Sequence, residues 1–267
     1  MNLALDLVRS VADAAADADG AAPLDEAAWL SLRAGDDGWH GVVTESGFVL
    51  SHGEDLHLVV HPEARGHGLA TSLLHDVEGP AKAWSHGDHP AAAALAARFG
   101  FERVRDLWVM RRPMSEPLPP LSDVGVRAWT SADTDELLRV NAEAFAHHPE
   151  QGAMDAANLA ARMAEPWFDP AGLLVAVEGE RMLGFHWTKQ HSADNGEVYV
   201  VGIAPDAQGR GLGRALTLAG LHHLAGLGVA EVLLYVEADN HAARSTYSRL
   251  GFTHADADTH VMYRRMP

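Results

Sequence analysis

The sequence predicts an α+β fold with a mixed sheet, arranged as two domains of one kind in tandem. Three observations support this prediction: strand-like and helix-like segments alternate, the same order of signals occurs twice, and a proline-rich segment separates the two occurrences. The chain has 267 residues, of which 47% are hydrophobic, so it is long enough for two domains. Each half is therefore expected to fold around a core of its own.

The first half contains an apolar strand followed by a turn and a helix. The strand is DLHLVV at residues 55–60, and Pro62 follows it. A glycine-containing turn then leads into LATSLLHDV, residues 69–77, whose apolar residues recur at helical spacing. The half closes with ARFGF at residues 97–101 and a short strand, DLWVMRR, at residues 106–112.

The second half repeats this order. The strand is EVYVVGI at residues 197–203, followed by Pro205, a glycine-rich turn and the helical run LGRALTLAGLHHLAGL at residues 212–227. SRLGF at residues 248–252 and the short strand HVMYRR at residues 260–265 close the half. A repeat of this length indicates a duplicated domain rather than a solenoid, whose units are about 20–50 residues long.

A proline-rich segment, RRPMSEPLPPLSDVGVR, spans residues 111–127 between the halves. Proline lacks an amide donor and fixes φ, so we expect no regular element within this segment. It is interpreted as an extended linker. The predicted domains span residues 1–112 and 127–267, with a linker at 113–126.

Composition excludes several classes of protein. No run of about 18 apolar residues occurs, so no membrane span is expected. The first residues carry several aspartates and lack the basic start of a secretory leader, which favours a mature cytoplasmic N-terminus. The absence of cysteine excludes disulfides, zinc–thiolate sites and a thiol nucleophile. The net charge of −17 would repel a polyphosphate backbone, so nucleic acid is not expected as a partner.

Seventeen histidines raise the question of a metal site. No pair shows the HExxH spacing of a helical zinc site, and the adjacent pair His222–His223 points in two directions on a helix. We therefore interpret the histidines as scattered surface residues and expect no metal.

The glycine-rich turn QGRGLG, residues 208–213, has the features of an anion site. Backbone N–H groups at a helix start have no internal partner, and the helix dipole favours negative charge there. Glycines allow the main chain to approach a phosphate, and Arg210 and Arg214 add positive charge. The turn matches neither a P-loop nor the dinucleotide fingerprint. It predicts a pyrophosphate site, with a tight strand-to-helix turn without a ligand as the alternative. The first half carries the weaker version RGHGLA at residues 65–70.

The order of motifs in the second half resembles the GNAT acetyltransferase superfamily. The QGRGLGR turn is followed at the expected distance by Asn240, Ala243, Tyr247 and Gly251, which match the pattern N-x-x-A-x-x-x-Y-x-x-x-GF. More narrowly, LLRVNAEAFAHHPEQG, EPWFDPAGLLVAVEG, LGFHWTK and GEVYVVGI are similar to the mycothiol synthase family. That resemblance implies two tandem GNAT domains and transfer of acetyl from acetyl-CoA to the cysteinyl amine of cysteinyl-glucosaminyl-inositol, the last step of mycothiol biosynthesis.

The resemblance also implies which residues hold acetyl-CoA, through strand amides and the glycine turn. In the second half they are Val201, Gly202, Ile203, Gln208, Gly209, Arg210, Gly211, Leu212, Gly213, Arg214, Asn240, Ala243 and Arg244. Their counterparts in the first half are Leu58, Val59, Val60, Arg65, Gly66, His67, Gly68, Leu69 and Ala70.

Acetyl transfer to an amine requires a neutral amine and a protonated leaving thiol. An α-amine has a pKa near 8, so a carboxylate that takes its proton is useful at neutral pH. Glu197, at the start of the strand that feeds the glycine turn, is the candidate base, and an exposed strand-edge acid is the alternative. Tyr247 is the candidate acid because a phenol with a pKa near 10 is protonated at pH 7; a core tyrosine is the alternative. A strand amide would stabilise the thioester oxygen as it becomes negative.

The acceptor needs carboxylates and polar donors. The family resemblance suggests Lys189 and Glu26 as substrate-binding residues, together with Glu197. Glu150 lies on a loop that could close over the acceptor, and Tyr235, on the strand VLLYVE, could point into the same cleft as Tyr247. Ordinary surface positions are the alternative for Lys189, Glu150 and Glu26, and core packing is the alternative for Tyr235. If Glu26 contributes, the acceptor site lies between the domains.

The first half is predicted to be non-catalytic. Its strand and turn are retained, and Glu54 occupies the position of Glu197. Ala96, however, replaces the phenol of Tyr247, and His89 replaces Asn240. We expect this half to act as a scaffold that can hold acetyl-CoA without reacting.

Other activities stay open at this point. A GNAT enzyme for an antibiotic, a polyamine or a protein N-terminus would show the same cofactor motifs. A non-catalytic acyl-CoA-binding protein is the alternative from another class. A fused pair of domains lowers the need for a dimer, so a monomer is expected.

Overall fold

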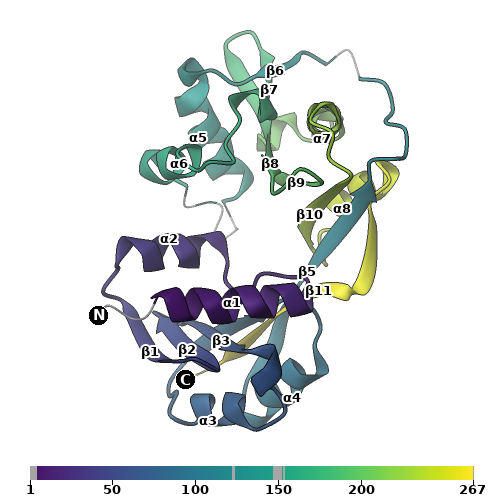
Figure 1. Cartoon of the computed structure of the whole chain (residues 1–267). Coiled ribbons are helices and arrows are strands. Elements are labelled where there is room, and N and C mark those ends of the chain that lie inside the picture. Colours follow the sequence, from purple (N-terminus) through teal and green to yellow (C-terminus); the bar gives the residue numbers. More distant parts are fainter. Residues whose placement is uncertain (1–4, 122–123, 147–151, 153, 267) are drawn as a thin grey trace. The chain divides into compact units, whose positions relative to one another are not determined.

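The computed structural model describes residues 5–121, 124–146, 152 and 154–266. The chain forms two compact units (Figure 1). The N-terminal unit comprises Met1–Trp108 and Ala255–Pro267, and the C-terminal unit comprises Val109–His254. The chain thus leaves the first unit within strand β5 (Glu102–Pro113) and returns to it within β11 (Thr253–Arg265).

The units of the structure follow contacts in space, whereas the bounds 1–112, 113–126 and 127–267 stay a prediction. The two divisions differ for the last strand. Val261–Arg265 of β11 pair antiparallel with Ala81–Ser85 in the N-terminal unit. The strand with which β11 pairs is decided by long-range contacts, for which the local sequence carries no signal.

The N-terminal unit has helices on both faces of its part of the sheet, in which the strand order is β1-β2-β3-β4-β11 (Figure 1). Its other strands are β1 (Trp39–Thr44), β2 (Gly47–His52), β3 (Asp55–Val60) and β4 (Ala81–Ser85). Its helices are α1 (Leu5–Asp19), α2 (Glu26–Ala34), α3 (Leu69–His75) and α4 (Pro90–Arg98), with a 3-10 turn at Pro62–Ala64.

Side chains of β2 alternate between two cores in this unit. Phe48 and Leu50 pack with α1, whereas Val49 packs with residues of α3 and α4. Helix α1 fits the first core because Val8, Val11, Ala12 and Ala15, all buried, lie on one helical face.

The C-terminal unit has the strand order β5-β10-β9-β8-β7-β6. Its further strands are β6 (Val126–Ala128), β7 (Leu173–Glu178), β8 (Arg181–Gln190), β9 (Asn195–Ile203) and β10 (Glu231–Glu237). Its helices are α5 (Thr134–Ala144), α6 (Ala156–Met163), α7 (Leu212–Gly226) and α8 (His241–Arg249), with 3-10 turns at Ser131–Asp133, Pro170–Gly172 and Pro205–Ala207. Helices α5 and α7 both pack on β8 and β9, from opposite sides (Figure 1).

Two expectations from the sequence are wrong in part. The segment 111–127 is not irregular throughout, because Arg111–Pro113 end β5 and Val126–Arg127 lie in β6. The histidines are not all surface residues either, since His186 and His260 are buried.

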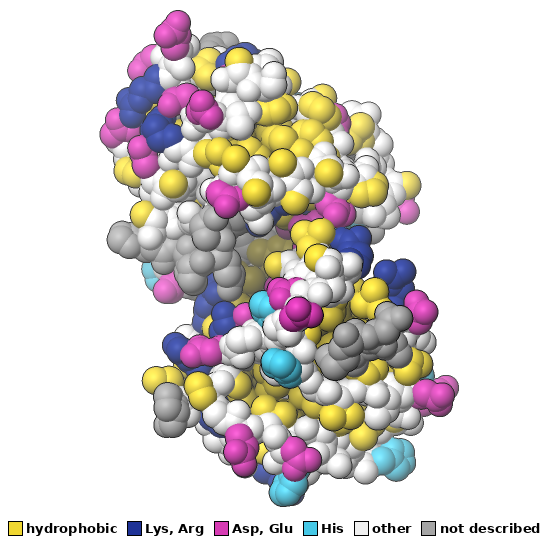
Figure 2. Space-filling view, turned by 90° about the vertical axis from the view of Figure 1, so that its left-hand side faces the viewer, with side chains coloured by type: hydrophobic (Ala, Val, Ile, Leu, Met, Phe, Trp, Pro, Cys, Tyr) yellow, Lys and Arg dark blue, Asp and Glu magenta, His cyan; other side chains and the backbone are white. Residues whose placement is uncertain are grey.

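The described residues contain no group of three or more His, Cys, Asp or Glu side chains arranged to hold a metal ion. No helix among them is long and apolar enough to cross a membrane. Acidic side chains are spread over both units on the face shown in Figure 2.

His186 is a wholly buried imidazole on β8. Its Nδ1 lies 2.9 Å from the carbonyl oxygen of Leu216, and burial lowers the pKa of His186 to about 4. An unfolded histidine titrates near pH 6.5, so the unfolded chain binds a proton in a range where the folded chain does not. Stability from the neutral imidazole is therefore complete above pH 6.5 and is lost as the pH falls from 6.5 to about 4.

We expect the free energy of unfolding to fall over this range by up to about 1.4 kcal/mol per pH unit for this one group. The measurement compares wild type with His186→Gln in urea unfolding from pH 7.5 to 4. The difference between the two curves should shrink toward acid pH, because the variant lacks the titrating ring. Parallel curves would contradict the assignment.

Candidate active site

A notch opens between β9 and β10 of the C-terminal unit. The two strands pair in parallel from Asn195 with Glu231 to Val198 with Leu234, and the described pairing stops there. β9 continues to Ile203 and stays paired with β8 on its other side. Residues 201–203 of β9 therefore extend beyond its pairing with β10.

The glycine turn lies at the end of β9. Gly209 and Gly211 have φ values of +76° and +79°, a left-handed conformation that glycine adopts without strain. A Cβ added at either position would meet no atom within 4 Å, so the turn borders open space. Helix α7 begins at Leu212 without a side-chain cap, which leaves its first N–H groups for a ligand. Arg210 pairs with Glu178 at 2.9 Å on the surface.

The N-terminal unit has an equivalent notch. β3 pairs in parallel with β4 only at Asp55 and Lys82, and Gly66 and Gly68 again have positive φ values, +78° and +84°. A cavity of about 580 Å³ occupies this opening. It is lined by residues 56–60, most of residues 64–71, the end of β4 and residues of α4, among others. The two halves thus share the opening that the sequence repeat predicted as a cofactor site.

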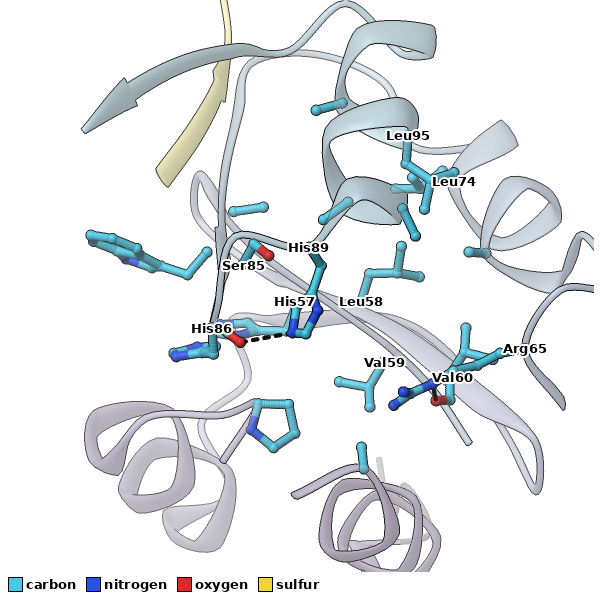
Figure 3. A pocket seen from close by; sticks show the side chains of 18 of the residues that line it. His57, Leu58, Val59, Val60, Arg65, Leu74, Ser85, His86, His89 and Leu95 are labelled. Carbon is cyan, nitrogen blue, oxygen red and sulfur yellow. Dashed lines mark hydrogen bonds between the residues drawn. The ribbon is translucent and has the colours of Figure 1, made fainter. Parts of the chain in front are cut away.

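The cavity has two chemically different ends (Figure 3). His57, His86 and His89 gather at one end, and Arg65 lies at the other. Desolvation lowers the pKa of His57 and lowers that of His86 to about 4, so both rings are neutral at pH 7. Arg65 donates to both carboxylate oxygens of Asp19 at 2.6 and 2.8 Å, an ion pair that raises the pKa of the guanidinium.

Glu197 is buried on β9, four residues before the β9 amide of Val201. It is 6% exposed, so the alternative of an exposed edge acid is wrong. Its Oε2 lies 2.6 Å from Nε2 of His191, which the sequence analysis did not single out. His191 lies six residues before Glu197 in a hairpin loop, so this contact can be inferred only once the strand register is known.

Tyr247 lies on α8 with its ring edge-on to Phe252 at 5.9 Å between centroids. The side chain is half-buried by exposed area, but protein atoms surround the phenol, and this desolvation raises the pKa of Tyr247 to about 12. The phenol is therefore protonated at neutral pH. Asn240 caps the same helix by accepting a hydrogen bond from the amide of Ala243 at 3.1 Å.

The suggested acceptor residues differ in their surroundings. Lys189 lies opposite Glu197 in the β8–β9 register, with Nζ 4.4 Å from the ring centroid of Trp167. Tyr235 is 44% exposed on β10, so the core-packing alternative is wrong for it. Glu26 is the first residue of α2, in the N-terminal unit. Glu150 lies outside the described residues.

The first-half counterparts of Tyr247, Asn240 and Glu197 have different surroundings from those three residues. Ala96 is buried on α4, and His89 precedes α4 without capping it, unlike Asn240. Glu54 is about half exposed and pairs with Arg264 at 3.3 Å, and it is not among the residues that line the cavity. Glu54 thus does not repeat the buried carboxylate of Glu197 at the corresponding position.

Two tandem units, each with a notch between parallel strands and a glycine turn, define an acetyltransferase of the GNAT type. Residues 135–252 match the model of the acetyltransferase (GNAT) family. A tandem GNAT protein from the clavulanic acid biosynthesis pathway has the same fold, with a TM-score of 0.69 at 18% identity over 98% of this chain and 95% of its own.

Full-length relatives narrow the family. The chain is 61% identical to the mycothiol acetyltransferase of Nocardioides sp., over 97% of this chain and 96% of that protein. It is 46% identical to the mycothiol acetyltransferase of Catenulispora acidiphila, over 96% and 94%. The chain belongs to the mycothiol acetyltransferase family.

A change at the glycine turn tests the predicted cofactor site. Gly211→Val would place a branched side chain in the left-handed region and in the open space of the turn. We expect weaker binding of coenzyme A, by about tenfold or more, because the valine side chain would obstruct the close approach of the main chain to the pyrophosphate. Titration calorimetry measures the Kd.

The matched control for Gly211→Val is Gly228→Val. Gly228 has a φ of +83° after α7 and equal free space, but it lies outside the turn. The Gly228→Val substitution therefore imposes the same backbone strain at a position away from the predicted site. Equal affinities in the two variants would contradict the assignment of the turn.

Proposed function

We propose that this chain transfers the acetyl group of acetyl-CoA to the cysteinyl amine of cysteinyl-glucosaminyl-inositol, the last step of mycothiol biosynthesis. The buried Glu197 beside the β9–β10 notch supports the reaction type. The shared name of relatives that match along nearly the whole chain supports the acceptor. The names of these relatives disfavour an antibiotic, a polyamine or a protein N-terminus as the acceptor, and they also disfavour a non-catalytic role.

In the proposed reaction the notch holds the pantetheine arm along β9, through the amides of Val201, Gly202 and Ile203. The turn from Gln208 to Gly213, with Arg214, holds the pyrophosphate, and the start of α8 completes the cofactor site with Asn240, Ala243 and Arg244. The fit is supported by the end of the β9–β10 pairing before Val201 and by the open space at Gly209 and Gly211.

Glu197 takes a proton from the acceptor ammonium, directly or through water, so that the amine nitrogen can attack the thioester carbon. A β9 amide stabilises the negative oxygen that forms. The C–S bond then breaks, and the phenol of Tyr247 donates its proton to the departing thiolate. The second proton lost by the nitrogen restores the phenol. Lys189, Tyr235, Glu26 and Glu150 are proposed to bind the acceptor.

We propose that the N-terminal unit binds acetyl-CoA in its cavity without turnover. Leu58, Val59 and Val60 are the counterparts of the β9 amide residues, and all three line the cavity. The further proposed contacts are Arg65, Gly66, His67, Gly68, Leu69 and Ala70. The lack of a buried carboxylate and of a phenol at the corresponding positions supports an inactive site. We also propose that the protein is a cytoplasmic monomer.

The test is turnover of the purified full chain with acetyl-CoA and a panel of amines. Cysteinyl-glucosaminyl-inositol is compared with an aminoglycoside, spermidine and a peptide with a free N-terminus. We expect its kcat/KM to exceed the others by on the order of a hundredfold or more, because a site with placed polar groups rejects acceptors that leave them unpaired. A better substrate elsewhere in the panel would overturn the proposed acceptor.

Tyr247→Phe tests the acid. The change removes the phenol oxygen and retains the ring that packs on Phe252. We expect kcat to fall on the order of a hundredfold with little change in the Kd for acetyl-CoA. Stopped assays of product and calorimetry separate the two quantities. Unchanged turnover would remove the proposed role of the phenol.

A further inference from the structure

The hairpin loop between β8 and β9 brings an imidazole to the proposed base. β8 ends at Gln190, and the register places Lys189 opposite Glu197. The amide of His191 donates to the carbonyl of Asn195 at 2.9 Å, which closes the loop. His191 is therefore held at the mouth of the hairpin, with its ring directed back along β9 to Glu197.

The two partners differ sharply in exposure. The side chain of Glu197 is 8% exposed, whereas that of His191 is 39% exposed, and Nε2 and Oε2 are 2.6 Å apart. The imidazole thus contacts the buried carboxylate on one side and water on the other. Lys189 also lies near Glu197, but an ammonium has no lone pair and cannot accept a proton.

Acetylation of an ammonium releases one net proton for each turnover. The nitrogen loses two protons, of which one is released and the other replaces the proton that Tyr247 gives to the thiolate. A buried base that has accepted a proton must return it to water before the next cycle. The proposed function therefore requires a route from Glu197 to solvent.

We propose that His191 is a positioning and proton-exit residue for Glu197, an inference that depends on the proposed function. In the resting site the Nε2–H of His191 donates to the ionised carboxylate and orients it. After Glu197 has taken a proton, the exposed ring exchanges to its Nδ1–H tautomer through water. Nε2 then accepts the proton from the carboxyl group, and Nδ1–H releases one to water, which restores the resting pair.

His191→Ala tests the proposal in the full-length enzyme. It removes both the orienting hydrogen bond and the exit. We expect kcat to fall about 10- to 100-fold, the range for partners that orient a functional group, with the KM for acetyl-CoA unchanged. Imidazole added at roughly tens of millimolar should restore part of kcat, because a small base in solution can carry the proton in place of the missing side chain.

Two further variants separate proton transfer from orientation and from general effects. His191→Gln keeps an amide donor for Glu197 but cannot carry a proton, so its kcat should stay low. His40→Ala removes an exposed histidine on β1 of the other unit and should have wild-type kcat, without a response to imidazole.

The outcomes are distinct. A His191→Ala enzyme with wild-type kcat would overturn the proposal. Full activity in His191→Gln, with no imidazole effect on His191→Ala, would overturn the proton-exit role. If Glu197→Gln retains its activity, the proposed base itself is wrong and the inference fails with it. If Glu197→Gln is inactive and His191→Ala is not impaired, only the inference about His191 fails.

Discussion

Glu197→Gln is expected to lower kcat about 10²- to 10⁴-fold, the usual contribution of a general base. The amide has nearly the same shape as the carboxylate but cannot take a proton from the acceptor ammonium. The Kd for acetyl-CoA should stay near the wild-type value, because Glu197 is not among the proposed cofactor contacts. Initial rates with saturating substrates and calorimetry with acetyl-CoA measure the two quantities.

The control for this variant is Glu143→Gln. Glu143 is an exposed acid at the end of α5 that pairs with Arg139 at 2.8 Å, and the same loss of charge there should leave kcat unchanged. Raising the pH should recover part of the activity of Glu197→Gln, because more of the acceptor is then neutral, with an ordinary amine pKa near 8. A kcat within a few-fold of wild type at pH 7 would show that Glu197 is not the base.

Arg112→Met is expected to lower the free energy of unfolding of the C-terminal unit by about 3–5 kcal/mol, because each buried carbonyl that loses its donor costs about 1–3 kcal/mol. Arg112 is 2% exposed. Its Nε donates to the carbonyl of Leu250 at 2.8 Å, and Nη2 donates to the carbonyls of Glu116 and Pro117 at 3.0 and 3.2 Å. These bonds join the end of α8 to the proline-rich segment, and methionine leaves the three carbonyls without that donor.

Arg103→Met provides a matched comparison for Arg112→Met. Arg103 is about two-fifths exposed and pairs with Asp88 and Asp106, so its loss should cost only about 0–1 kcal/mol. Urea unfolding followed by tryptophan fluorescence gives both values. Because α8 carries Tyr247, Arg112→Met should also lower kcat in the fraction that stays folded. Equal unfolding midpoints for the two variants would show that the buried guanidinium is not a structural support.

Local signals allowed the sequence to predict much of the candidate site. Strand β9, the glycine turn and helix α7 follow one another within a short segment. The apolar run, the glycines and the helical spacing of apolar residues therefore identify the three elements together. Asn240 likewise caps α8, as the motif implied, because a cap depends only on neighbours three residues away. The duplicated notch was predictable for the same reason, since each copy carries its own turn.

The sequence misjudged features that depend on distant partners. The histidines looked like surface residues, yet His186 is buried against a carbonyl of α7. Glu54 aligned with Glu197, yet it faces Arg264 of the last strand rather than the cavity. Burial of a polar side chain depends on which elements pack over it, and that information is not in the residues next to it.

The sequence by itself determined two repeated strand–turn–helix units, a glycine turn suited to a phosphate and the residue types for acid–base chemistry. These follow from backbone preferences and short-range periodicity. The tertiary structure alone decided that β11 pairs with β4, that His191 contacts Glu197, and that Arg112 joins the proline-rich segment to the end of α8. Each of these contacts results from long-range strand pairing or packing, whose geometry is set by the whole fold rather than by adjacent residues.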